Sequence, residues 1–162
     1  MFKQPDKAPK SYTPLEAVPK IAAYCAYQER THKEVAEKLR SYGLDEDEAG
    51  EIIIRLGREK LLDEERYAQA YARGKHRTNG WGRRRIRMEM KAKGLSEFCI
   101  KSGLKELDGD EYYDKLKQLL GQRDAREKES HPQKRKLKLM AYLTQKGYES
   151  DLIQEALNEL NA

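Results

Sequence analysis

The sequence predicts an all-α protein in which three tandem three-helix repeats form an elongated helical array. Its 162 residues include only two valines and two phenylalanines but abundant Leu, Ala, Glu, Lys and Arg, a composition that favours helix over sheet. Charged residues make up 38% of the chain, well above the usual share of about 25%, which indicates a large surface relative to the core. Similar runs also end in a glycine three times, at Gly43, Gly94 and Gly147, which are 51 and 53 residues apart.

Apolar residues keep fixed distances from these three glycines. They lie eight and four positions before each glycine, and one, six, ten and thirteen positions after it, in all three copies. Offsets of three and four place such residues on one face of a helix. Glycine fits the position just after a helix because the chain there takes a left-handed conformation. Each repeat is therefore expected to contain a helix, a glycine cap and a further helix, with one more helix in front.

The first repeat is expected to cover residues 14–62, after a Pro- and Lys-rich tail, residues 1–13, that should be disordered. Its first helix is expected at 15–29. A capping box at 31–34 opens the second helix, and Asp45 is a good N-cap for the third. The buried face of the first helix is expected to contain Ile21, Tyr24 and Cys25.

The second repeat is expected to cover residues 63–108, with a first helix at 63–76. Asn79-Gly80 then breaks the chain before Trp81-Gly82. On the helix that follows, Ile86 and Met90 form the buried stripe. Trp81 is either a core anchor beside the turn or an exposed contact residue. The buried face of the first helix is expected to contain Tyr67, Ala70 and Tyr71.

The third repeat is expected to cover residues 109–162. Its first helix is predicted at 110–126, and His131-Pro132 opens the second helix, since proline suits the first helical turn. The last helix should begin at Glu149 or Ser150. The buried face of the first helix is expected to contain Tyr113, Leu116 and Leu120.

Several classes of function receive no support. The longest apolar run has seven residues, 21–27, and the N-terminus has no apolar signal segment, so we expect a cytoplasmic protein without a membrane span. The two cysteines are expected to be reduced and buried. The three histidines are far apart in sequence, and there is no phosphate-cradling glycine loop, so we expect no metal, no cofactor and no catalysis. The acidic pairs at helix starts are read as caps.

The basic residues concentrate between Arg73 and Lys93, where nine positive charges face one acid, Glu89. Like charges at Arg83, Arg87 and Lys91 recur every four residues, which slightly destabilises a helix. The stripe is therefore either a solvated face neutralised by the acidic stretch 45–66 or a surface for an anionic partner. A second basic cluster opens the matching helix of the third repeat. The candidate partner-binding residues are Arg73, Arg77, Arg83, Arg84, Arg87, Lys91, Lys134, Arg135 and Lys138.

The ten tyrosines are expected to fill small cores with a solvated hydroxyl. Stacking on nucleic acid bases would require tyrosines interleaved with arginines on one face.

Two motifs in the second repeat resemble the RecX family of RecA regulators. The first is Leu62-Asp63-Glu64-Glu65-Arg66-Tyr67-Ala68. The second runs from Gly82 to Leu95 and is similar to the family pattern Gly-Pro-x-Arg-(Ile/Leu)-x-x-Glu-Leu-x-x-Lys-Gly-(Ile/Val). It matches at Gly82, Arg85, Ile86, Glu89, Lys93 and Gly94, with Arg83 in place of Pro and Met90 in place of Leu. In the third repeat, residues 142–148 are similar to the family's Phe-Leu-x-x-Arg-Gly-Phe, with Lys146 in place of Arg.

The resemblance covers about residues 15–160 and implies a curved, elongated array of three three-helix repeats. The structural motif residues are taken to be Gly43, Asp63, Tyr67, Trp81, Gly82, Ile86, Gly94 and Gly147. We expect a monomer, because three units can cap each other without a partner. The resemblance further implies that the chain binds the RecA nucleoprotein filament and inhibits recombinase, ATPase and coprotease activity in DNA repair, homologous recombination and the SOS response. Groove binding and capping of filament ends both fit. The alternatives are direct binding to single- or double-stranded DNA through the basic face of the second repeat, and a scaffold for an acidic protein.

Overall fold

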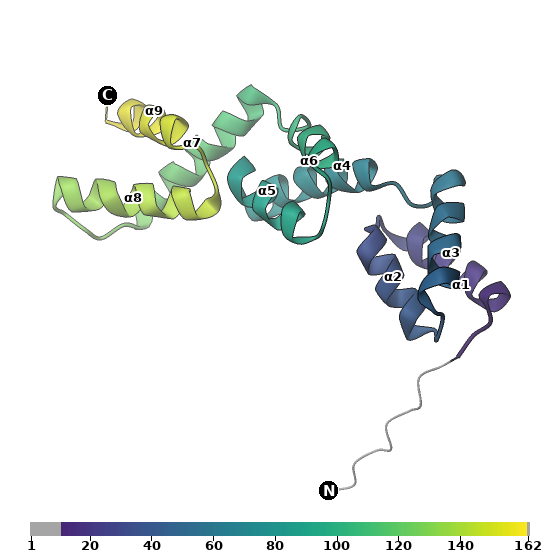
Figure 1. The fold of residues 1–162 in the computed structure, drawn as a ribbon. Helices are drawn as coiled ribbons and strands as arrows, with labels where there is room; N and C mark the ends of the chain where they lie inside the picture. Colours follow the sequence, from purple (N-terminus) through teal and green to yellow (C-terminus); the bar gives the residue numbers. More distant parts are fainter. Residues whose placement is uncertain (1–10, 162) are drawn as a thin grey trace, which may run out of the picture. The chain divides into compact units, whose positions relative to one another are not determined.

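The computed structural model describes residues 11–161, and within them the chain forms nine α-helices, one short π-helical turn and no β-strand (Figure 1). The chain divides into two compact units, one ending at Tyr67 and one starting at Ala68. Most of the tail that we expected to be disordered, residues 1–10, lies outside the described residues. Tyr12, near its end, donates its backbone N–H to the Tyr42 carbonyl over 2.8 Å. No helix of the described part is long and apolar enough to cross a membrane.

The first unit contains α1 (Pro14–Tyr27), α2 (His32–Ser41) and α3 (Glu46–Arg58), which pack on one another. Thr13, Thr31 and Asp45 cap the three helices. The capping box expected at 31–34 is formed in part: Thr31 accepts the Glu34 N–H, and the Glu34 carboxylate accepts the Thr31 hydroxyl. The complete capping box is at α3, where Asp45 and Glu48 each accept the other's backbone N–H and where only an N-cap was expected. Ile21 and Cys25 are buried as predicted, whereas Tyr24 is only half-buried.

The second three-helix group consists of α4 (Glu64–Gly74), α5 (Arg83–Ala92) and α6 (Glu97–Leu104). Asp63 accepts the Arg66 N–H at the start of α4, as expected of a cap. Tyr67 is buried as predicted, but the other buried residues of α4 are Ala68 and Ala72, and the expected Ala70 and Tyr71 are half-buried. The prediction was wrong there because the alternating Ala and Tyr residues fit two neighbouring helix faces equally well.

The π-helical turn Lys75–Asn79 (η1) replaces the last turn of the helix that we expected to end at His76. Gly80 ends it with φ +68°, and His76 is carried into the core. A π-helical turn adds one residue per turn, so it rotates the following chain relative to the α4 face. The hydrophobic periodicity of the sequence did not predict this switch from α-helix to a π-helical turn.

The third group consists of α7 (Gly109–Arg126), α8 (Pro132–Lys146) and α9 (Ser150–Leu160), each packed on the other two. Leu116 and Leu120 are buried as predicted, but Tyr112 is buried beside them and Tyr113 is half-buried. The predicted left-handed glycines are present in all three groups, with φ of +88° at Gly43, +82° at Gly94 and +101° at Gly147.

Candidate partner interface on α5

Helix α5 carries its core residues on one side and four of the nine candidate cations on the others. Ile86 and Met90 are completely buried, as predicted. The helix begins after Gly82, which lies so close to Gly147 that an added Cβ would sit 2.4 Å from the Gly147 carbonyl carbon. Two backbone hydrogen bonds join the same segments, from Gly82 N–H to the Lys146 carbonyl (2.8 Å) and from Arg84 N–H to the Gly147 carbonyl (2.9 Å). The start of α5 is thereby fixed against the end of α8.

Arg83 does not belong to an outward-facing stripe. Its Nη1 lies 2.7 Å from Glu149 Oε2, and its guanidinium carbon lies 3.7 Å from the centre of the Tyr112 ring. The Tyr112 hydroxyl accepts the Arg83 backbone N–H and donates to Glu149. Arg83 is therefore a structural residue that ties α5 to α7 and α9, and the expectation that it binds a partner is unsupported by its position.

Arg73 and Arg87 also have acidic partners, but on the surface. Arg87 Nη1 lies 2.9 Å from Glu97 Oε2, and Arg73 Nη1 lies 3.3 Å from Glu106 Oε2. Exposed ion pairs of this kind contribute little to stability and open easily. The acids that neutralise this basic segment therefore include residues of α6 and the chain after it, which follow the segment in sequence.

The outward face of α5 is formed by Arg84, Met88 and Lys91. Their spacing of four and three residues places them on one side of the helix, and all three are exposed. Neither Arg84 nor Lys91 forms an ion pair with a described residue. Met88 is 64% exposed, and Phe98 on the adjoining α6 is 69% exposed. A partner that fits this face needs negative charge together with some apolar surface.

Arg77 adds one more cation close to this region of the chain. It lies in η1 with an exposed side chain that forms no ion pair with a described residue. Trp81 is half-buried, with the Lys75 ammonium 5.1 Å and the Arg85 guanidinium 4.2 Å from its ring. The indole therefore holds two cations in place rather than filling a core.

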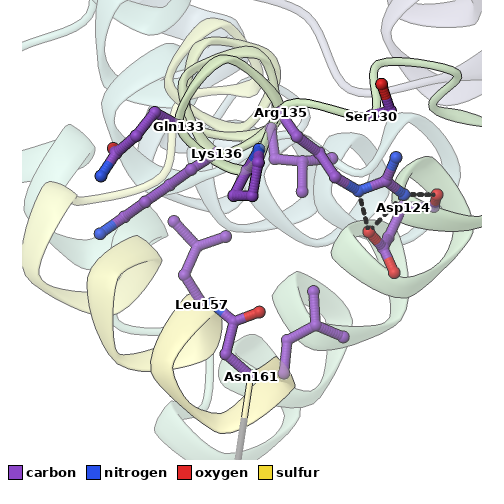
Figure 2. A pocket seen from close by; sticks show the side chains of 10 residues that line it. Asp124, Ser130, Gln133, Arg135, Lys136, Leu157 and Asn161 are labelled. Carbon is purple, nitrogen blue, oxygen red and sulfur yellow. Dashed lines mark hydrogen bonds and ion pairs between the residues drawn. The ribbon is translucent and has the colours of Figure 1, made fainter.

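The second predicted basic cluster is largely occupied by internal contacts. The Arg135 guanidinium points at Asp124, 2.7 Å away (Figure 2). It also donates to the carbonyls of Glu127 and Glu129. Lys138 Nζ lies 3.8 Å from Glu127 and 3.6 Å from Glu129. The Arg135 contacts close the segment between α7 and α8, so Arg135 is a structural residue. Lys138 is exposed and, like Arg73 and Arg87, has acidic partners, whereas Lys134 is exposed without an ion pair to a described residue.

The Glu127 carboxylate is the acceptor at the centre of this second cluster. The Glu129 backbone N–H, together with nearby Lys138 and Arg123, lowers the pKa of Glu127. A lowered pKa keeps this carboxylate ionised, which maintains its pairs with the surrounding cations.

His76 is a structural residue that sequence reasoning missed. Its ring is stacked on Tyr112 with centroids 5.2 Å apart, and its Nδ1 lies 3.0 Å from the Trp81 carbonyl. The Tyr148 hydroxyl donates to the Gly80 carbonyl in the same cluster, over 2.9 Å. Burial is the main effect that lowers the pKa of His76 and raises those of Tyr112 and Tyr148. No group of three or more potential metal ligands occurs among the described residues.

Three family models match successive parts of the chain. They describe the first three-helix domain of RecX (residues 22–56), the second (63–104) and the third (110–157).

The similar proteins of known name agree with one another. The chain is 28% identical to the regulatory protein RecX of Oceanobacillus iheyensis, over 99% of the chain and 57% of that protein. It is 31% identical to the regulatory protein RecX of Mycobacterium sp. (strain KMS), over 80% of the chain and 75% of that protein. The chain thus spans little more than half the length of several relatives.

Solved structures give the same result. The crystal structure of RecX from Lactobacillus salivarius superposes with a TM-score of 0.84 at 27% identity, covering 91% of the chain and 96% of that structure. A further RecX crystal structure gives a TM-score of 0.81 at 25% identity, over 90% of the chain and 73% of that structure. Helices, glycine caps, motifs and comparisons thus agree, and the chain belongs to the RecX family of regulatory proteins.

Proposed function

We propose that this chain is a non-catalytic, cytoplasmic regulator that acts as a monomer, binds the RecA–single-stranded DNA filament and inhibits its recombinase, ATPase and coprotease activities. Membership of the RecX family supports this proposal most directly. Three similar units in one chain also suit a filament, because several weak contacts with neighbouring subunits add up to strong binding.

Within the molecule, the observation that carries the proposal is the outward face of α5. Arg84 and Lys91 are exposed cations without ion-pair partners among the described residues, and Met88 lies between them. Cations on an exposed helix face speed association with an acidic surface and fix its orientation. Arg77 and Lys134 are further exposed cations of the predicted set, whereas Arg83 and Arg135 serve the fold.

The test is a charge reversal on this face. In the double variant Arg84→Glu/Lys91→Glu, two attractions become repulsions, so inhibition of the DNA-dependent ATPase of RecA should weaken at least about tenfold. Ile86 and Met90 remain in place, so helix content should stay close to that of the wild type.

The matched control is Arg40→Glu/Arg58→Glu, which makes the same change in net charge at two exposed arginines of the first unit. This control should inhibit nearly normally. If both variants lose inhibition equally, net charge is responsible; if the α5 variant inhibits normally, the proposed face is wrong. Binding to bare duplex DNA is measured in parallel. The direct-DNA alternative predicts equal affinity for the duplex and for the RecA filament, whereas the proposed function predicts tighter binding to the filament.

A further inference from the structure

The first unit carries an alternation of tyrosine rings and cationic side chains along α1 and α2. Tyr12 and Tyr42 meet edge to face with centroids 5.3 Å apart. The Lys20 ammonium lies 4.7 Å from the Tyr12 ring, and the Lys38 ammonium lies 5.8 Å from Tyr42 and 5.4 Å from Tyr24. The guanidinium carbon of Arg30 lies 3.6 Å from the centre of the Tyr24 ring. This is the interleaved arrangement that base stacking requires and that the sequence pattern did not reveal.

The tyrosines also border open space. One hollow of about 530 Å³ is lined by Tyr12, Lys20, Ala23, Lys38, Ser41 and Tyr42. A second hollow of about 310 Å³ is lined by Tyr24, Glu34, Glu37, Lys38 and Ser41. The two hollows share Lys38 and Ser41, so they are neighbours, each with at least one tyrosine in its wall. All three tyrosines are only half-buried.

We propose that this tyrosine face, formed by Tyr12, Tyr24, Tyr42, Lys20 and Lys38, binds single-stranded nucleic acid. Successive bases would occupy the two hollows and stack on the tyrosine rings, a contact that any base can make. Lys38, shared between the hollows, meets the phosphate that links the two bases. Lys20 meets the next phosphate, on the side of the larger hollow.

The charges around the hollows fit this orientation of the strand. Among the residues that the structure describes, no acidic side chain lines the larger hollow, where Lys20 and Lys38 lie. In the smaller hollow, Glu34 is engaged by the Thr31 hydroxyl (3.3 Å) and by Arg30 (4.0 Å). Glu37 is exposed at its rim, where a carboxylate repels phosphate but accepts a hydrogen bond from the amino group of a base. The phosphates therefore follow the lysines and a base edge faces Glu37.

This site is separate from the α5 face and does not depend on the proposed inhibition of RecA. Duplex DNA offers no unstacked base, so a tyrosine face discriminates against it. Exposed cations on a helix, as on α5, show no such discrimination because they meet phosphate in either form.

The experiment measures fluorescence anisotropy of a short fluorescein-labelled single strand of mixed sequence, and of the matching duplex, with the full chain at low salt. The wild type should bind the single strand more tightly than the duplex. Tyr24→Leu and Tyr42→Leu should each weaken single-strand binding at least about fivefold, whereas Tyr42→Phe, which keeps the ring, should bind nearly as the wild type does. The double variant Lys20→Gln/Lys38→Gln should reduce the slope of log affinity against log salt by about 1.4.

The matched controls are Tyr27→Leu and Lys33→Gln, which change an exposed tyrosine and an exposed lysine outside both hollows. Both should bind as the wild type does. Equal affinity for duplex and single strand, or folded tyrosine variants with unchanged binding, would overturn the proposal. If those variants keep single-strand binding but lose the RecA filament, the face belongs to a protein partner and the proposal is wrong. If the leucine variants fail to fold by circular dichroism, the lysine variant decides, because an unchanged salt slope contradicts phosphate contact.

Discussion

Gly82 and Gly94 are both motif residues, but different physical effects require glycine at the two positions. Gly94 has φ +82° with open space around it, so backbone conformation alone disfavours other residues there. Gly82 has an ordinary backbone conformation, with φ −81°, but faces the Gly147 backbone at a distance that no Cβ can share.

We expect Gly82→Ala to lower the free energy of unfolding by about 3 kcal/mol, because backbone on both sides must move. Gly94→Val should cost about 1–2 kcal/mol, the cost of a left-handed conformation for a residue with a Cβ. Urea unfolding of both variants checks the order. A smaller loss for Gly82→Ala than for Gly94→Val would show that the two segments separate easily.

His76 should make stability depend on pH. Burial lowers its pKa, as do nearby Lys115 and Arg83, against the opposing effects of the Trp81 carbonyl and Glu111. The unfolded chain therefore takes up a proton near the ordinary histidine pKa of about 6.5, before the folded chain does. The free energy of unfolding should thus fall as the pH is lowered from about 7 to about 5.

The variant His76→Phe keeps a ring against Tyr112 but cannot titrate. At pH 7 it should be less stable than the wild type, by about 1–3 kcal/mol, because the Trp81 carbonyl loses its partner. The difference should shrink on acidification, as followed by thermal unfolding. A difference that stays constant between pH 7 and 5 would mean that His76 does not titrate in this range.

Single residues also show where the sequence was ambiguous. Tyr112 and Tyr113 both lie three or four positions before Leu116, so periodicity alone cannot choose which one is buried. The choice is made by Arg83 and Glu149, which hold the Tyr112 hydroxyl from other parts of the chain. Glu149 lies 66 residues from Arg83, so counting charges within the local segment made Arg83 look unpaired.

At the scale of elements, the helices and their glycine caps could be predicted because they depend on near neighbours in sequence. The three glycine caps, the Asp45 N-cap of α3 and the buried stripe of α5 all follow from local patterns within a few residues. The π-helical turn and the outward face of α5 could not be predicted, because both depend on which side of a helix packs against residues far away in the sequence. The predicted stripe on α5 therefore began one residue too early, at Arg83, which contacts Glu149 and Tyr112, whereas the outward face begins at the exposed Arg84.

The segment between α7 and α8 depends on one side chain, Arg135. Its guanidinium bonds Asp124 and the carbonyls of Glu127 and Glu129 at once. We expect Arg135→Ala to reduce the free energy of unfolding by about 2–3 kcal/mol, since hydrogen bonds to a charged group are lost and acceptors are left unpaired. Arg135→Lys should not rescue it, because an ammonium cannot reproduce the fork of donors.

The comparison for this prediction is Lys134→Ala, one residue away and exposed. It should leave urea unfolding unchanged. Equal effects at the two positions would show that Arg135 acts only through its charge.

At the scale of the whole molecule, a destabilising substitution in one core should unfold only part of the chain. The first unit has its own core, in which Ile21, Val35 and Leu39 are completely buried. A unit of about 50 residues has a marginal core, so Ile21→Ala, with an expected cost of about 2–5 kcal/mol, should unfold it locally. Hydrogen exchange should show lost protection in α1–α3 and retained protection in α5 and α7–α9. Uniform loss across the chain would mean that the units fold only together.

The seam between Gly82–Arg84 and Lys146–Gly147 is built from main-chain atoms. Its two hydrogen bonds use peptide groups that every residue except proline possesses, and it constrains side-chain identity only where the two glycines meet. Substitutions on the exposed faces of α5 and α8 can therefore accumulate over generations without altering these two hydrogen bonds. For the same reason, another helical unit could be appended to an engineered protein by copying this backbone pairing with its two glycines. The outer surface of the appended unit could then be redesigned for a new target.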